Sequence, residues 1–187
     1  MSTTGYLTNH LLIAMPALAD QNFSRAVTFI CEHNEDGALG VIINRPGDVA
    51  LGEILHQMNL DAADPQVAGQ AVYQGGPVSP ERGFVLHGDD SRWEATLRVG
   101  PDTGVTSSRD ILEAIVAKQG PRDYLVAMGY AGWAAGQLDE EMRDNAWLSV
   151  PAQHEILFHT PDSQRWHAAT RLLGIDPDRL SGEAGHA

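Results

Sequence analysis

The sequence Tyr-Leu-Val-Ala-Met-Gly-Tyr-Ala-Gly-Trp, residues 124–133, says most about the fold. Its first five residues form a nearly continuous apolar run, which is typical of a strand that is buried on both faces of a sheet. Two glycines and two aromatic residues follow at 129–133. Glycine lets another backbone approach closely, and Tyr and Trp supply contact area with a polar tip. The stretch therefore predicts a central strand, 124–128, with a candidate binding corner at its end.

Apolar runs elsewhere predict further strands. Residues 26–31 and 39–43 flank the acidic, glycine-ended turn 34–37, which predicts a β-hairpin that ends at Asn44–Gly47 because proline cannot donate to a ladder. Residues 84–87 and 94–99 are expected to pair with each other, joined by 88–90. The remaining predicted strands are 10–15, 71–73, 146–150 and 156–158.

Helical spacing of apolar residues predicts helices between these strands. Leu51, Ile54, Leu55 and Met58 form one apolar stripe, and the segment 107–110 resembles a capping box with Ser107 as N-cap and Asp110 at N3. Further helices are predicted at 137–144 and from Pro161, with Trp166, Ala169, Leu172 and Leu173 on the buried face. Because the elements do not alternate as regular βαβ units, we expect an α+β fold around a mixed sheet.

The length of the chain indicates its number of domains, and its net charge limits the partners it can bind. The 187 residues suit one domain, which we place at 1–180 with a flexible tail at 181–187. Acidic residues outnumber Lys and Arg by 25 to 12, so the formal net charge is −13. Affinity for DNA and for anionic lipid comes largely from cationic side chains, so direct contact with nucleic acid or a membrane is not expected.

The N-terminal sequence predicts a cytoplasmic protein. Residues 11–15 are apolar and Ala17–Ala19 resembles a cleavage site, but the first basic residue is Arg25, whereas a signal peptide requires a positive segment ahead of its apolar run. No apolar run approaches the ~18–20 residues that cross a bilayer. A single cysteine, Cys31, excludes an intrachain disulfide and fits a reducing compartment.

Familiar catalytic signatures are absent. The sequence contains no phosphate-binding loop, no strand-linked GxGxxG, no GxSxG elbow, no HExxH and no EF-hand spacing. Cys31 and His33 lie two positions apart, so a strand would point both side chains to one face, either as a thiol activated by an imidazole or as a metal-binding pair. Acidic neighbours have the wrong sign to lower a thiol pKa. We therefore predict that Cys31 is a core residue, that no cofactor is bound and that the protein is not an enzyme of a standard class.

Three histidines near the C-terminus, His154, His159 and His167, raise the question of a metal site. Their spacings of five and eight match no pair on one face of an α-helix. No metal site is predicted from them, because scattered histidines are common on protein surfaces.

The candidate binding residues lie at predicted strand ends or in the loops that follow them, where scaffolds place binding groups. Gly75–Pro77 is either a backbone nest for an anion or a tight turn, and the aromatic residues at 129–133 either bind a ligand or pack over the glycines. The mixture of groups suits a polar or anionic ligand or a peptide segment better than an apolar cofactor. We expect these residues to gather on one side of the fold: Asn44, Arg45, Gly75, Gly76, His87, Tyr130, Trp133 and Gln137.

These motifs, in this order, resemble the YqgE/AlgH family of bacterial proteins from about Leu11 to Leu173. The resemblance implies a mixed, bifurcated sheet curled toward a pseudo-barrel, and a cytoplasmic setting. Some members are labelled transcriptional regulators of exopolysaccharide synthesis, and no catalytic residues come with the resemblance. The matching blocks are 11–16, 31–33, 37–40, 43–46, 75–78, 83–87, 129–133, 136–138 and 145–148.

Two classes of function remain open. The first is a non-enzymatic binding or regulatory protein that acts through a protein or small-molecule partner. The second is an enzyme with an unfamiliar site built from the corners at Asn44–Arg45, Gly75–Gly76 and Gly129–Trp133. Because standard catalytic motifs are absent and the charge disfavours DNA, the sequence favours the first class.

Overall fold

The computed structural model describes residues 5–15, 24–88, 93–176 and 179. In this part of the chain ten strands form one curled sheet with the order β10-β1-β2-β3-β9-β6-β8-β7, and β5 pairs with both β9 and β4. The strands are β1 (His10–Ala14), β2 (Val27–Asn34), β3 (Gly37–Ile42), β4 (Pro46–Ala50), β5 (Ala71–Gln74), β6 (Val78–Gly88), β7 (Thr96–Gly100), β8 (Thr103–Thr106), β9 (Tyr124–Ala134) and β10 (Trp147–Pro151).

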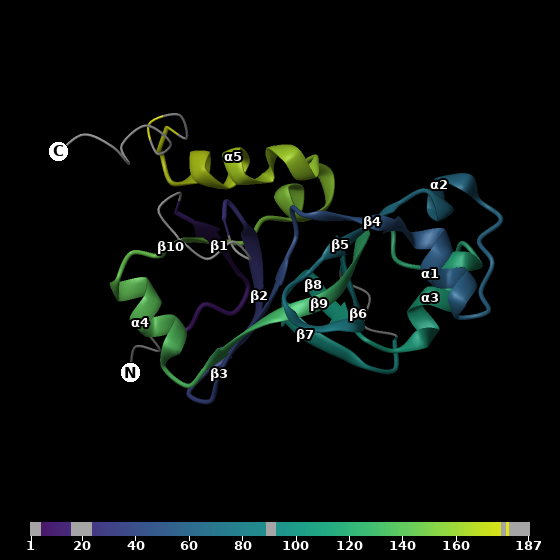
Figure 1. Ribbon diagram of the computed structural model, residues 1–187, viewed down its shortest axis with the longest axis horizontal. Coiled ribbons are helices and arrows are strands. Elements are labelled where there is room, and N and C mark those ends of the chain that lie inside the picture. Colours follow the sequence, from purple (N-terminus) through teal and green to yellow (C-terminus); the bar gives the residue numbers. More distant parts are fainter. Residues whose placement is uncertain (1–4, 16–23, 89–92, 177–178, 180–187) are drawn as a thin grey trace.

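The helices lie at the two ends and on one side of this sheet (Figure 1). The helices α1, α2 and α3 gather at one end, α4 lies at the opposite end beside β3, and α5 covers β1, β2 and β10. No helix among the described residues is long and apolar enough to cross a membrane. The helices are α1 (Leu51–Gln57), α2 (Pro65–Ala68), α3 (Arg109–Val116), α4 (Gln137–Arg143), α5 (Asp162–Leu172) and the π-helix η1 (Glu155–His159).

The central strand β9 confirms the predicted fold class. One of its edges pairs with β6, whereas its other edge is shared by two strands: β5 pairs in parallel with residues 126–128, and β3 pairs antiparallel with residues 131–134. Because β3 and β5 occupy successive halves of the same edge of β9, the sheet divides there and is bifurcated. The sheet is mixed because the β5–β9 pair is parallel and the other pairs are antiparallel. The apolar run therefore belongs to a strand that continues through the glycines instead of ending before them.

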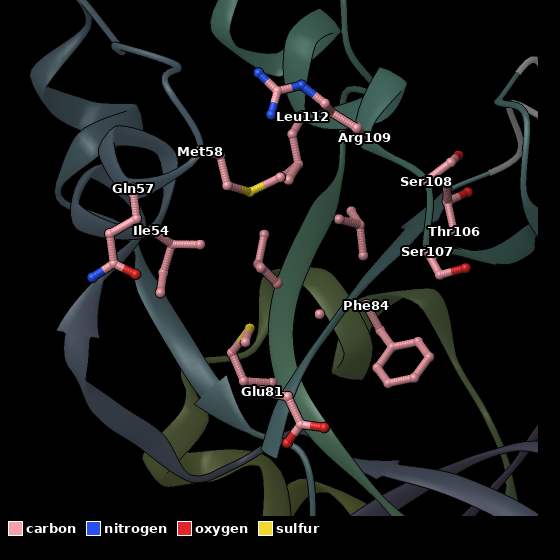
Figure 2. Close-up of a pocket in the computed structure, with 14 residues that line it drawn as sticks. Ile54, Gln57, Met58, Glu81, Phe84, Thr106, Ser107, Ser108, Arg109 and Leu112 are labelled. Carbon is pink, nitrogen blue, oxygen red and sulfur yellow. The ribbon is translucent and has the colours of Figure 1, made fainter. Parts of the chain in front are cut away.

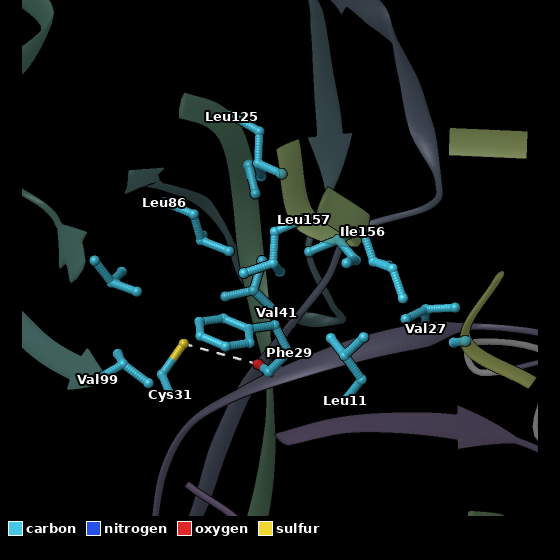
Figure 3. Close-up of a cluster of buried hydrophobic side chains, with 14 of the residues drawn as sticks. Leu11, Val27, Phe29, Cys31, Val41, Leu86, Val99, Leu125, Ile156 and Leu157 are labelled. Atoms are coloured by element: carbon cyan, nitrogen blue, oxygen red, sulfur yellow. Dashed lines mark hydrogen bonds between the residues drawn. The ribbon is translucent and has the colours of Figure 1, made fainter. Parts of the chain in front are cut away.

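The predicted hairpin is confirmed as β2 and β3. Its turn is closed by the backbone N–H of Asp36, which donates to Asn34 Oδ1 over 2.8 Å. Side chains of this hairpin pack with those of β1, β6 and β9 in a buried apolar cluster (Figure 3). Cys31 lies in this cluster with 2% of its surface exposed, and its Sγ donates to the carbonyl oxygen of Phe29 over 3.8 Å. Burial, with a smaller contribution from Glu32, raises the pKa of the Cys31 thiol to about 12, which supports the core role.

The predicted pairing of 84–87 with 94–99 is wrong. The short strand β8 lies between them, with Val85 opposite Thr106 and Leu97 opposite Val105. The sequence of β8, Thr-Gly-Val-Thr, is rich in β-branched residues but has only four residues and one large apolar side chain, so it shows no apolar run or alternation. Asp89 and Asp90, two residues of the predicted connection 88–90, lie outside the described residues. Ala17–Ala19 and the predicted tail 181–187 also lie outside them.

The hairpin ends before Asn44 as predicted, because β3 stops at Ile42, but a further strand that was not predicted, β4, begins at Pro46. Pro46 lies opposite Tyr73 of β5, on a strand with no second neighbour among the described residues. An edge strand tolerates proline because the missing donor would have faced outward.

One strand prediction and two helix predictions need correction. Residues 156–158 form part of the π-helix η1 and not a strand. Helix α3 begins one residue later than predicted, with Ser108 as N-cap, so Asp110 occupies the second helical position. Helix α5 begins at Asp162 with Pro161 as N-cap, and Leu172 is exposed although Trp166 and Ala169 are buried as predicted.

Candidate functional site

A cavity of about 350 Å³ lies between α1 and α3, above β6 and β9 (Figure 2). Residues of α1 line one side, the segment 106–108 lines the other, and Glu81 lies at the edge opposite α3. Its floor and walls are mostly apolar: Ile54, Met58, Gly83, Phe84, Val85, Leu112, Val126 and Met128. Its polar lining is Gln57, Glu81, Thr106, Ser107, Ser108 and Arg109.

The cavity forms because one set of side chains on α1 and α3 packs against the sheet, while the neighbouring positions on the same helices are left to line a space above Gly83. Leu51 and Leu55 of α1 and Ile111 and Ile115 of α3 are buried against the sheet. The neighbouring helix positions, such as Leu112, are only partly buried and line the cavity. Below them, Gly83 has no side chain to fill the space, and a Cβ there would lie 3.3 Å from the sulfur of Met128.

The rim of the cavity carries one cationic side chain, which is paired, and several carboxylates. Arg109 donates from Nε to Glu113 Oε1 over 3.0 Å, and Glu81 supplies one anionic group. At the start of α3, burial acts to raise the pKa of Asp110, but hydrogen bonds from Ser108 and from the backbone N–H groups of Glu94 and Ile111 outweigh it and hold the pKa below its usual range. Because this ionised carboxylate already occupies the helix N-terminus, the cavity does not favour an anionic group there.

The eight residues expected to form one site do not line a common cavity in the described structure. Arg45 and Gly76 share a small cavity of about 100 Å³ with Ile42, Gln74 and Pro77. Trp133 lines a different cavity at the β2–β3 turn. The prediction that all eight lie at strand ends or in loops is wrong for Tyr130, which lies within β9, whereas Trp133 precedes the last residue of that strand.

Residues 44–45 and 75–76 have structural partners. Asn44 accepts a hydrogen bond from the N–H of Val27 at Oδ1 and donates from Nδ2 to the carbonyl of Arg25, over 2.9 and 3.0 Å. Arg45 donates from Nη2 to the carbonyl of Ser24 over 2.7 Å. The Asn44 bonds join the end of the hairpin to the start of β2.

The pair Gly75–Gly76 lies directly against β9. A Cβ on Gly75 would lie 2.3 Å from the carbonyl oxygen of Gly129, and one on Gly76 would lie 2.1 Å from the carbonyl carbon of Tyr130. Gly76 also has a φ of +155°. Glycine is required at both positions because two backbones meet there, which favours the tight-turn interpretation over an anion nest.

His87 is buried, with 1% of its surface exposed. Its Nδ1 lies 2.8 Å from the carbonyl oxygen of Gly88, which can only accept, so Nδ1 carries a proton, and its Nε2 lies 2.7 Å from the hydroxyl oxygen of Thr106. The arrangement resembles an activated hydroxyl, but Thr106 has no exposed surface. His87 pairs with Tyr124, nine positions along β9 from Trp133, so the two lie roughly 30 Å apart along the strand.

Tyr130 and Trp133 face opposite sides of β9 because their positions differ by an odd number. The ring of Tyr130 packs edge-on against Phe84. Trp133 packs against Trp147 and donates from Nε1 to Glu141 Oε2 over 2.6 Å. Gln137 accepts the N–H of Ala134 over 3.0 Å, so its side chain helps to begin α4.

The structure brings together two histidines that the sequence analysis left unassigned. Nε2 of His154 lies 2.8 Å from Asp123 Oδ2, and Nε2 of His159 lies 3.1 Å from Asp123 Oδ1. Hydrogen bonding to His154, and then to His159, holds the pKa of Asp123 below its usual range. Hydrogen bonds to Asp123 and Glu155 raise the pKa of His159. His167 does not take part, since its ring packs against Trp166.

Comparison with known proteins places the chain in a family. The AlgH-like family model matches residues 11–178. UPF0301 proteins from Nitrosococcus oceani and Thioalkalivibrio sulfidiphilus are 54% and 51% identical over 187 residues, the full length of both chains in each case. The solution structure of the AlgH protein from Pseudomonas aeruginosa aligns with a TM-score of 0.81 at 46% identity, covering 100% of this chain and 99% of that one.

A crystal structure from Corynebacterium diphtheriae shares the fold, with a TM-score of 0.73 at 22% identity over 100% of this chain and 95% of the other. The curled sheet with its helices at the ends is therefore common to both solved structures. With a family model that spans most of its length and full-length relatives above 50% identity, the chain belongs to the AlgH-like family.

Proposed function

We propose that this protein is a non-enzymatic ligand-binding protein whose cavity between α1 and α3 holds a small molecule. The observation that carries the proposal is the combination of an apolar floor with a hydrogen-bonding rim in a space of about 350 Å³. Ligand sites in proteins are commonly concave and mostly apolar, with a few polar groups that fix orientation, and begin at about this size.

The lining selects the chemical class of the ligand. Side chains such as Phe84, Leu112 and Met128 favour an apolar or aromatic body. The amide of Gln57 and the hydroxyls of Ser107 and Ser108 favour hydrogen-bonding groups at its edge. Because Arg109 is already paired with Glu113, and both Glu81 and the ionised Asp110 are anionic, an anionic ligand is disfavoured and the favoured ligand is neutral overall.

A binding role fits the cavity better than catalysis. Among the described lining residues, the hydroxyl with an imidazole partner is that of Thr106, which is wholly buried. A nucleophile must reach its substrate, so this pair stabilises the β6–β8 region and does not react. We extend the proposal to a regulatory role in the cytoplasm, in which ligand occupancy alters contact with a protein partner, because the net charge of −13 disfavours direct contact with DNA.

The test uses a probe of the favoured class, benzamide, which has an aromatic body and a neutral amide edge. Ligand-observed NMR should detect binding of benzamide to the wild type. Leu112→Trp should abolish it because the larger side chain fills the cavity. Leu172→Trp is the matched control, since Leu172 is exposed on α5 and lines no part of this cavity. Binding that survives in folded Leu112→Trp, or no binding to the wild type, would contradict the proposal.

A further inference from the structure

Asp123, His154 and His159 form a cluster of metal-ligand type outside the proposed ligand cavity. Asp123 immediately precedes β9, and the two histidines belong to η1 and its N-cap. One donor atom from each of the three residues lies within 4.8 Å of the other two. Each oxygen of the carboxylate faces one imidazole Nε2, so three donor groups from two distant segments converge on one small volume.

The π-helix is what brings the histidines together. In an α-helix, residues five apart point about 140° away from each other, because each residue turns the helix by about 100°. A π-helix is wider, with i→i+5 hydrogen bonds, so residues five apart lie one above the other. Single π turns occur frequently at functional sites. Ile156 and Leu157 are buried and anchor η1 to the core, while His154 and His159 are both partly exposed.

Further contacts fix the orientation of both imidazoles. Nδ1 of His159 lies 3.2 Å from Glu155 Oε2, which directs its Nε2 toward Asp123. A carboxylate on the second ring nitrogen is the usual partner of a metal-binding histidine. The ring of His154 packs against Phe158 with centroids 4.8 Å apart, and the absence of a side chain on Gly88 leaves room for it.

We propose that Asp123, His154 and His159 bind a divalent transition-metal ion of the Zn²⁺ class, through two Nε2 atoms and one carboxylate oxygen. Imidazole ligands favour such ions over Mg²⁺ and Ca²⁺, which prefer oxygen donors. The side chains of His154, His159 and Asp123 are 41%, 46% and 25% exposed, so a fourth position is accessible to water or an external ligand. Three protein ligands with one open position is the arrangement of reactive, exchangeable zinc sites.

A simple surface ion pair looks different in the same molecule. His56 Nδ1 lies 3.0 Å from Asp61 Oδ1, but these side chains are 80% and 84% exposed. That pair has one imidazole and is not part of any three-residue cluster found among the described residues. The His56–Asp61 pair is therefore a matched control: it has a histidine–carboxylate contact but no third metal-ligand side chain beside it among the described residues.

The experiment is a titration of the tag-free, chelator-treated full chain with ZnCl₂ by isothermal calorimetry. The wild type should bind one equivalent of Zn²⁺ and should show no binding of Mg²⁺. Asp123→Asn, His154→Gln and His159→Gln should each weaken Zn²⁺ binding by more than about tenfold. His56→Gln should bind Zn²⁺ as the wild type does.

A second measurement covers variants that fail to fold. In ¹⁵N-labelled wild type, Zn²⁺ should shift the ring Nε2 resonances of His154 and His159 and leave those of His56 unchanged. The proposal is overturned if the wild type does not bind Zn²⁺, if folded Asp123→Asn and His154→Gln bind as tightly as the wild type, or if the shifts occur only at other histidines.

Discussion

Arg165 donates a hydrogen bond from Nε to the carbonyl oxygen of Ile156, 3.0 Å away, and so joins α5 to the π-helix η1. The same buried guanidinium donates from Nη2 to Leu157 over 3.1 Å and from Nη1 to the carbonyl of Ile43. It also lies over the ring of Tyr73, 5.2 Å from the centroid. One side chain therefore connects α5, η1 and the end of the β2–β3 hairpin, and stabilises the segment that carries His154 and His159.

Arg165→Lys should lower the free energy of unfolding by about 2–4 kcal/mol, because an ammonium group cannot reach all three carbonyls and buried acceptors would lose their partners. Urea denaturation measures this change. Arg171→Lys on the same helix is the control, since Arg171 is exposed, and should change stability by less than about 0.5 kcal/mol. Equal stability of the two variants would show that the Arg165 contacts do not support the fold.

Gly76→Ala should destabilise the protein by at least ~3 kcal/mol or prevent folding, because the added Cβ would overlap the backbone of Tyr130. Gly136→Ala is the matched control: Gly136 also has a positive φ, +76°, but a Cβ there meets nothing within 4 Å. It should cost only about 1 kcal/mol. Thermal or urea unfolding of both variants separates close packing from backbone strain, and a similar loss in both would refute the packing argument.

Several strands and helices were predictable from the sequence because their signals are local. The hairpin 26–43, the apolar run at 124–128 and the helical stripe at Leu51–Met58 each follow from periodicity and turn chemistry. Strand β8 was not predictable in this way, since Val105 is its one large apolar residue and pairing with β6 and β7 determines its conformation. Similarly, η1 depends on the tertiary contacts of Arg165, which a short apolar run does not reveal.

The candidate sites were harder to predict because they depend on contacts between distant segments. Asp123 carries no local signal, and it meets His154 and His159 across more than thirty positions of sequence. The spacing of five between the histidines was visible, but it indicates a common face only if a π-helix is considered. The corner at Gly75–Gly76 was identified correctly as unusual, but its glycines are explained by contact with β9.

Cys31 should not react with iodoacetamide at pH 8 in the native protein and should react readily in urea, because burial holds its pKa at about 12. An unfolded thiol ionises near ~8.5, so the unfolded state loses the proton first as the pH rises. The contribution of the neutral Cys31 thiol to the free energy of unfolding is therefore complete below about pH 8.5. Above that pH the free energy of unfolding falls by up to ~1.4 kcal/mol per pH unit.

Cys31→Ala is the control for this pH dependence. Between about pH 9 and 11 its free energy of unfolding should fall less steeply than that of the wild type, because the variant has no thiol to ionise. Cys31→Ser should be less stable than Cys31→Ala because a hydroxyl costs more to bury than a methyl group. Rapid alkylation of the native thiol, or an identical alkaline decline in Cys31→Ala, would contradict the core role.

Direct binding to DNA should be absent at physiological salt. The chain carries 25 acidic residues against 12 basic ones, so few cations are available to replace counterions on the phosphates. An electrophoretic mobility assay in about 150 mM salt, with nanomolar protein and a mixture of genomic fragments, checks this expectation. A retained complex under those conditions would require a local basic surface and would contradict the proposed mode of action.

The most direct measurement of the central claim, that the cavity between α1 and α3 is a ligand site, is methyl NMR of protein labelled with ¹³C-methyl methionine. Met58 and Met128 line the cavity, whereas Met142 packs with the separate cluster around Trp133 and Trp147. Benzamide, and then the low-molecular-mass fraction of a bacterial cell extract, would be added to the full chain. Ligand binding predicts shifts of the Met58 and Met128 resonances with Met142 unchanged. Unchanged Met58 and Met128, or equal shifts at Met142, would contradict it.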